Sequence, residues 1–185
     1  VVREALRSTT ALGLTSTQTG KGTFVVAGRV ARDMVLGNFS ARELSEARPH
    51  IEVPSAQFAA QRRTADDVVI LRGIVESMVT EDDPQVWVNL DGSFHQEIAR
   101  ASGNGVFGQV VAGIREAMAN QSETLNLVAG RMRQSDEEHQ VIFNAIAEGS
   151  AVNAGEAMRI HLSAVNEALE SIFGANNTEG THAAG

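Results

Sequence analysis

Helix-start signals followed by apolar residues at helical spacing recur from residue 40 to residue 173, and they limit this chain to folds built from packed helices. Three signals are capping boxes, in which Ser or Thr stands three residues before Asp or Glu: Ser40 with Glu43, Thr64 with Asp67, and Ser135 with Glu138. Asp83 followed by Pro84 is another, because proline is tolerated at the first helical position. We predict helices over residues 41–62, 65–79, 84–102, 106–133, 136–148 and 151–173, with Pro49 and Pro54 kinking or breaking the first.

Ahead of these helices the sequence predicts a short helix and a β-hairpin. Residues 1–12 have a helical pattern, and Gly13 ends it in the manner of a C-terminal cap. Two stretches rich in β-branched residues follow, at 14–17 and 23–26, and Gly20, Lys21 and Gly22 form the turn between them. This turn is neither a P-loop nor a dinucleotide-binding loop, because the spacing to Lys21 is wrong and no GxGxxG follows Gly20.

The composition favours a mainly α protein over a sandwich or barrel, since aromatic residues are only 4% of the chain. There is no cysteine, which excludes disulfide scaffolds, Cys-ligated zinc, iron–sulfur clusters and thiol nucleophiles. No apolar run reaches the roughly 20 residues of a membrane span, and the first residues lack a secretory signal pattern. We expect a cytoplasmic protein with a disordered tail over 174–185, so that His182 is not a ligand.

The charge is unevenly distributed. Residues 1–32 contain five basic residues and one acidic residue, a net charge of +4, whereas the whole chain carries -8. A basic segment joined to an acidic body is typical of a nucleic-acid-binding arm on a domain with another task, although a solvated basic surface gives the same pattern.

Four ionisable residues are predicted to point into the helical core. Asp91 and His95 are four residues apart on the apolar face that includes Phe94. His139 shares its face with Ile142, Phe143 and Ile146, and His161 lies between Ala157 and Val165 on the apolar face of the last helix. Any one of these histidines alone is more often a hydrogen-bonded core residue than a ligand.

Together the four residues suggest a metal site. A buried Asp is costly unless it is paired, and no inward Lys or Arg stands out on the same faces of these helices. One carboxylate and three imidazoles form a mixed N/O donor set suited to a divalent cation, zinc first, with nickel, cobalt or manganese as alternatives. Such a site could also activate water in a metal-dependent hydrolase, but no inward Glu stands out as a general base.

The sequence also resembles a known family. The first stretch, VVREALRSTTALGLTSTQTGKGTFVV, is similar to the end of the winged helix-turn-helix of GntR-family transcription regulators. The remainder resembles the FCD ligand-binding domain of the FadR subfamily through EARPHIEVPSAQFAAQRRTADD, NLDGSFHQEIARASGN and EEHQVIFNAIAEGSAVNAGEAMRIHL. Family members carry further helices of the winged motif upstream, so the resemblance implies that this sequence begins inside that motif.

The resemblance implies a homodimeric, effector-responsive regulator, most often a repressor, that binds operator DNA. Its domains would be a partial winged helix-turn-helix over 1–27, a linker over 28–39, an antiparallel helical bundle of the FCD type over 40–173, and the tail. The bundle would bind a small organic acid at a metal centre. A metal-sensing regulator, with the metal itself as signal, stays open as an alternative.

The resemblance also assigns residues to each role. The metal ligands would be Asp91, His95, His139 and His161. Arg48 and Asn104 would contact the carboxylate effector, although an ion pair for Arg48 and a helix-terminating turn for Asn104 are equally consistent with the sequence. Arg3 and Arg7 would reach DNA from the recognition helix, and Lys21 from the wing.

Overall fold

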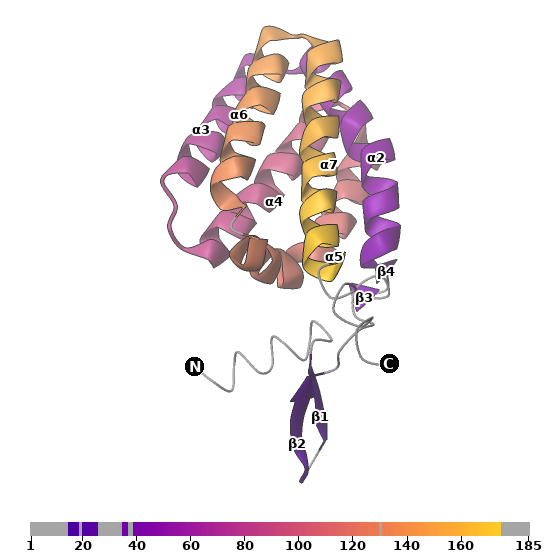
Figure 1. The fold of residues 1–185 in the computed structure, drawn as a ribbon. Helices are drawn as coiled ribbons and strands as arrows, with labels where there is room; N and C mark the ends of the chain where they lie inside the picture. Colours follow the sequence, from indigo (N-terminus) through magenta and orange to yellow (C-terminus); the bar gives the residue numbers. More distant parts are fainter. Residues whose placement is uncertain (1–14, 19, 26–34, 37–38, 130, 175–185) are drawn as a thin grey trace, which may run out of the picture.

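The computed structural model describes residues 15–18, 20–25, 35–36, 39–129 and 131–174 and shows a mainly helical protein (Figure 1). Six helices lie within this part of the chain: α2 (Ala41–Arg62), α3 (Ala65–Val79), α4 (Pro84–Ala101), α5 (Gly105–Ala129), α6 (Met132–Glu148) and α7 (Ala151–Gly174). The predicted six-helix, mainly α architecture is therefore confirmed. None of these helices is both long and apolar enough to cross a bilayer.

Three of the four predicted helix starts are present. The Ser40 hydroxyl accepts a hydrogen bond from the Glu43 backbone N–H, and the Glu43 carboxylate accepts one from the Ser40 N–H. Thr64 and Asp67 cap α3 in the same reciprocal way. The Asp83 carboxylate accepts hydrogen bonds from the first backbone N–H groups of α4, with Pro84 at its first position.

The capping box predicted at Ser135 and Glu138 is wrong. Helix α6 begins at Met132, so Ser135 is buried inside the helix and its N–H donates to the Arg131 carbonyl. The Glu138 carboxylate contacts the side chains of Arg131 and His161 instead of the backbone N–H of Ser135. For the same reason α5 ends at Ala129, earlier than the predicted 133.

Helix α2 is continuous through Pro49 and Pro54, so the predicted break does not occur. Each internal proline removes a backbone hydrogen bond, at a cost of about 3 kcal/mol. Packing offsets this cost, because α2 lies along α7 and its Ala56, Ala59 and Ala60 are 0% exposed. Tertiary burial therefore preserves a helix that local preference would interrupt.

The core lies between α2, α3, α4, α6 and α7 (Figure 1). Helix α7 packs against both α2 and α6, while α4 contacts α2, α3 and α5. The largest fully buried apolar side chains are Trp87, Phe94, Leu71, Met78, Ile98, Ile142, Ile146 and Met158. The Trp87 indole N–H donates to the Asp136 carboxylate at 2.8 Å, which satisfies the only polar group of that ring.

Two small antiparallel pairs precede the bundle. Strand β1 (Thr15–Gln18) pairs with β2 (Gly22–Val25), with Thr17 opposite Thr23, and β3 (Val35–Leu36) pairs with β4 (Phe39–Ser40). Gly20 and Gly22 have φ angles of 79° and 112°, which only glycine adopts freely. The predicted helix over 1–12, most of the linker and the tail lie outside the described residues, so the assignment of the hairpin as a wing stays a prediction.

Candidate metal centre

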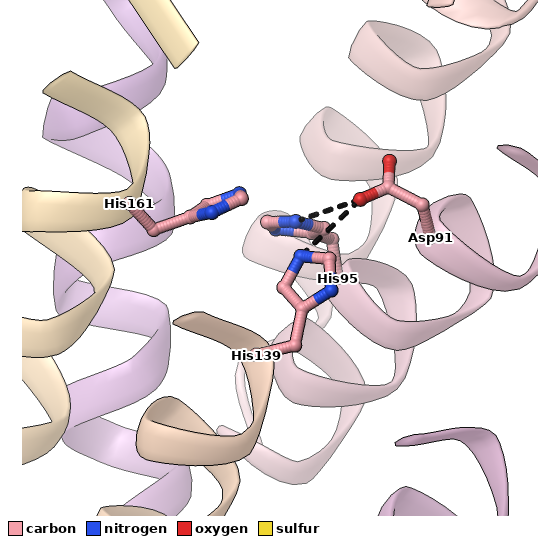
Figure 2. Close-up of side chains that lie close together, drawn as sticks. All are labelled: Asp91, His95, His139 and His161. Carbon is pink, nitrogen blue, oxygen red and sulfur yellow. Dashed lines mark ion pairs between the residues drawn. The ribbon is translucent and has the colours of Figure 1, made fainter. Parts of the chain in front are cut away.

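Three helices bring together the four residues that the sequence placed in the core. Asp91 and His95 lie on successive turns of α4, His139 lies on α6 and His161 on α7, and their side chains converge (Figure 2). All four are buried, and one possible ligand atom from each lies within 4.8 Å of the others. We call these four residues the Asp/His cluster.

The spacing within the Asp/His cluster suits a metal ion. The Asp91 Oδ1 atom is 3.3 Å from His139 Nε2 and 3.6 Å from His95 Nε2. The centroids of the His139 and His161 rings are 4.7 Å apart. An ion bound at about 2.1 Å holds tetrahedral donors roughly 3.4 Å apart. The two contacts of Asp91 already match that separation, and the wider ones would shorten around an ion.

Polar atoms in the cluster lack hydrogen-bond partners among the described residues. Both ring nitrogens of His139 and both of His95 are buried without one, although His95 Nδ1 lies 2.5 Å from Glu52 Oε2. A buried polar atom left unsatisfied costs about 1–3 kcal/mol. A bound cation would satisfy one nitrogen of each ring, and the donor set therefore fits a metal.

The protonation states also fit. Burial lowers the pKa of His139, and burial together with the neighbouring imidazoles holds the pKa of His161 well below its ordinary value. Burial alone would raise the pKa of Asp91, but Arg115 and the nearby histidines outweigh it and hold that pKa well below the usual range. Neutral imidazoles and an ionised carboxylate are the forms that bind a divalent cation.

Asp91 has an inward-facing arginine that comes from α5, a helix other than those whose faces carry the four residues. Arg115 of α5 donates to Asp91 Oδ2 at 2.7 Å, and its side chain is only 10% exposed. The need to neutralise a buried Asp is therefore not an argument for a metal. The other oxygen, Oδ1, is the one that faces the imidazoles.

Two glutamates lie beside the cluster, and neither was singled out from the sequence as one of its neighbours. Glu52 of α2 is 2% exposed, and its Oε2 lies 2.5 Å from His95 Nδ1. Glu138 Oε2 lies 2.7 Å from His161 Nδ1. Both contact the ring nitrogen of a histidine and are paired with arginines, so neither is placed as a free general base. Glu52 could have been found from its i, i+4 spacing to Arg48 and Ala56 on the buried face of α2.

The two predicted effector contacts lie in different settings. Arg48 is buried, and its Nε donates to Glu52 Oε1 at 2.5 Å. Glu52 in turn contacts His95, so Arg48 is connected to the cluster through Glu52. Asn104 caps α5, since its side-chain oxygen accepts from the Val106 N–H at 3.0 Å. It lies beyond the end of α4 at Ala101, and it is not among the residues that line the cavity beside Asp91.

Of the predicted DNA contacts, only Lys21 is described. It is exposed at the turn between β1 and β2, next to Gly20 and Gly22. Arg3 and Arg7 lie outside the described residues.

A cavity of about 270 Å³ reaches the Asp/His cluster from its Asp91 side. It lies between α4 and α5, and both members of the Asp91–Arg115 ion pair line it. The other lining residues are Val88, Asn89, Gly92, Ser93, Gln96, Ala112 and Glu116. A small anionic molecule in this cavity would have a guanidinium beside it.

Comparison with known proteins places this architecture in a family. The sequence model of the FCD domain matches residues 43–164. The HTH-type transcriptional regulator LutR of Bacillus subtilis is 27% identical over 188 residues, which cover 95% of this chain and 86% of that protein. A regulatory protein assigned to the L-lactate dehydrogenase operon of Escherichia coli is 33% identical over 132 residues, 69% of this chain, and the match spans 51% of that protein.

A solved structure agrees with the sequence comparison. The Streptococcus agalactiae GntR structure has a TM-score of 0.57 and 28% identity, covering 90% of this chain and 80% of that one.

Proposed function

Because this chain belongs to the GntR family of transcription regulators with a C-terminal FCD domain, we propose that it is an effector-responsive regulator whose helical bundle binds a divalent metal and a small organic acid. The family is one of transcription regulators and not of enzymes, and GntR regulators bind operator DNA. The single observation that carries the metal and effector proposal is the buried Asp/His cluster beside a cavity.

The metal would be held by Asp91, His95, His139 and His161, with zinc first and nickel, cobalt or manganese as alternatives. When bound, the cation supplies a concentrated positive charge that attracts a carboxylate. The chain's own residues fix the donors on three helices and exclude water from three of the four side chains, which are 2% exposed or less.

The effector would enter the cavity between α4 and α5. Arg115 offers a guanidinium there, and a carboxylate can accept from it in a bidentate manner. Arg48 would act from the other side of His95 through Glu52. A contact from Asn104 has weaker support, since its side chain already caps α5. L-lactate is the first acid to test, because one relative is assigned to an L-lactate dehydrogenase operon.

DNA binding would come from residues 1–27, with Arg3 and Arg7 on a recognition helix and Lys21 on the wing; residues 28–39 would be a linker and 40–173 the effector domain. Two-fold symmetric operators require two-fold symmetric proteins, so the regulator would be a homodimer. Lys21→Ala in the full-length protein should weaken binding to all sequences and flatten its salt dependence, whereas Arg3→Ala should also relax sequence preference.

One titration tests the proposal. Operator binding by the full-length protein is measured with zinc alone, with L-lactate and other small acids alone, and with both, while light scattering follows the oligomeric state. We expect a response to an acid only when the metal is present. A response to metal alone would instead indicate a metal sensor. A wild-type protein that binds none of the proposed divalent metals, or a monomer at micromolar concentration, would contradict the proposal.

A further inference from the structure

The metal-binding ability of a histidine depends on which ring nitrogen carries its hydrogen. A neutral imidazole has one N–H and one nitrogen with a free lone pair, and only the latter binds a metal. A group that accepts a hydrogen bond from one nitrogen therefore selects the other as the ligand. Two of the three histidines in the Asp/His cluster have such a group.

The first is Glu52, which reaches His95 from α2. Its Oε2 atom is 2.5 Å from His95 Nδ1, and both side chains are at most 2% exposed. The carboxylate is also held by Arg48 at 2.5 Å and by Arg115 at 3.4 Å, and these two cations favour its ionised form. The contact of Glu52 with His95 is not aligned as a regular hydrogen bond. An ionised carboxylate has no proton to offer, and at this separation it would repel an unprotonated nitrogen, so the proton of His95 belongs on Nδ1. His95 Nε2 then faces Asp91 Oδ1 at 3.6 Å.

The second is Glu138, which reaches His161 from α6. Its Oε2 atom is 2.7 Å from His161 Nδ1 and 2.8 Å from Arg131 Nη2. Arg131 in turn donates to the Ala164 carbonyl of α7 at 3.1 Å. The carboxylate is thus fixed between two helices, with an arginine on one side and an imidazole on the other.

His139 provides an internal contrast. Its ring is held by aromatic packing, 4.8 Å from the Phe94 ring by centroids, and neither of its nitrogens has a hydrogen-bond partner in the described part of the chain. The other two histidines each contact a Glu that is paired with an Arg. The two sets come from different helices and are Arg48–Glu52–His95 and Arg131–Glu138–His161.

We propose that Glu52 and Glu138 are positioning residues that hold Nδ1–H of His95 and His161, leaving Nε2 of each ring as the metal ligand. Arg48 and Arg131 keep each carboxylate in place. The inference rests on the proposed metal binding, and it assigns Arg48 to supporting a ligand instead of touching the effector directly.

The tautomers can be measured without any metal. Long-range ¹H–¹⁵N spectra of the metal-free wild type should show the proton on Nδ1 of His95 and His161. Glu138→Leu, which removes the acceptor at similar volume, should shift the His161 proton toward Nε2, while Glu138→Gln restores an acceptor and should recover part of the Nδ1–H form. Spectra showing Nε2–H at both rings in the wild type would overturn the inference even if metal binds.

Zinc affinity provides the second readout. Competition with a chromophoric chelator should show 10–100-fold weaker zinc binding for Glu138→Leu and an intermediate loss for Glu138→Gln. The visible spectrum of the cobalt-loaded protein should change with the same variants. Glu156→Leu is the matched control, because Glu156 lies on α7 and its side chain is 54% exposed.

The outcomes separate this inference from the proposed function. A wild type that binds zinc, with Glu138→Leu within twofold of it and an unchanged cobalt spectrum, overturns the positioning role and leaves the metal site standing. A wild type that binds none of the proposed divalent metals overturns both. Glu52→Gln extends the test to His95. If this variant fails to fold because Glu52 is deeply buried, the Glu138 variants alone test the inference.

Discussion

A single imidazole, that of His161, connects α7 to the proposed metal, since the other cluster residues lie on α4 and α6. His161→Ala should lower the metal content and abolish the response to the acid, because one ligand of four is lost. It should leave the dimer and basal DNA binding intact. The check is the melting temperature with and without chelator: the wild type should lose stability on chelation and the variant should not. An unchanged metal content in the variant would contradict the role of His161.

Arg115 is the residue whose loss should cost most stability, because it pairs with two buried carboxylates, Asp91 and Glu52. Arg115→Met leaves those carboxylates without this partner and should lower the free energy of unfolding by about 3 kcal/mol in the metal-free protein. Arg159→Met is the control, since Arg159 is 57% exposed in its pair with Glu156 and should change stability by about 0.5 kcal/mol or less. Urea unfolding measures both, and equal losses would argue against a buried network.

The residues of the site were predictable to different extents for a physical reason. Asp91, His95, His139 and His161 could be placed in the core because each lies on a local apolar face that helical periodicity reveals. The contacts of Glu52 with His95, of Arg115 with Asp91 and of Glu138 with His161 were not found, because each is made across helices. A sequence shows which face of a helix a residue is on, but not which helix lies opposite.

At the scale of a helix, Asp67 has two tasks that should appear in the pH dependence of stability. It caps α3 with Thr64 and pairs with Arg100, and although burial opposes these contacts, its pKa is lowered from 3.8. A lowered pKa adds stability above about pH 4 that is lost as the pH falls through the folded-state value. Asp67→Asn should therefore lower the free energy of unfolding at pH 7 by about 1 kcal/mol. It should also reduce the loss of stability that the wild type shows as the pH falls below about 4. Asp66 is exposed in the same turn and provides the control: Asp66→Asn should lower stability at pH 7 less than Asp67→Asn does, with both measured by urea unfolding.

Two helix glycines, one at the end of α6 and one inside α3, provide another matched pair of variants. Gly149 ends α6 with a φ of 81°, and an added Cβ would lie 2.7 Å from the Arg63 guanidinium. Gly149→Ala should lower the free energy of unfolding by about 1 kcal/mol or more. Gly73, inside α3, has nothing within 4 Å of an added Cβ. Gly73→Ala should raise stability by up to about 1 kcal/mol, and the same sign for both variants in thermal unfolding would contradict this account.

Helix bounds followed from the sequence wherever a local signal decides them. Ser40, Thr64 and Asp83 begin helices through contacts within one turn, and those starts were predicted. The start of α6 was missed, because Arg131 stands at its N-terminus without a side-chain cap and is held by contacts to α7 and Glu138. The break predicted at the prolines of α2 does not occur for the same reason, since packing against α7 keeps that helix continuous.

At the scale of the whole molecule, metal removal should loosen the bundle. A ligand at 100 times its dissociation constant stabilises the folded state by about 2.7 kcal/mol, which for a domain of this size is roughly 5–10 °C in melting temperature. Chelation should lower the melting temperature by that amount and zinc should restore it, while magnesium, which prefers oxygen ligands, should not. Calorimetry with each ion measures this, and equal recovery with magnesium would argue against an imidazole site.

The order of the ligands along the chain has a consequence for synthesis. Asp91 and His95 leave the ribosome first, His139 follows, and His161 comes last, on α7. A growing chain folds from its N-terminal side while translation continues. Until α7 emerges, such a chain offers two or three donors without the final imidazole, and it holds a cation only weakly. In the proposed site, firm metal retention would therefore require a chain translated through α7, and truncated products would release metal instead of trapping it.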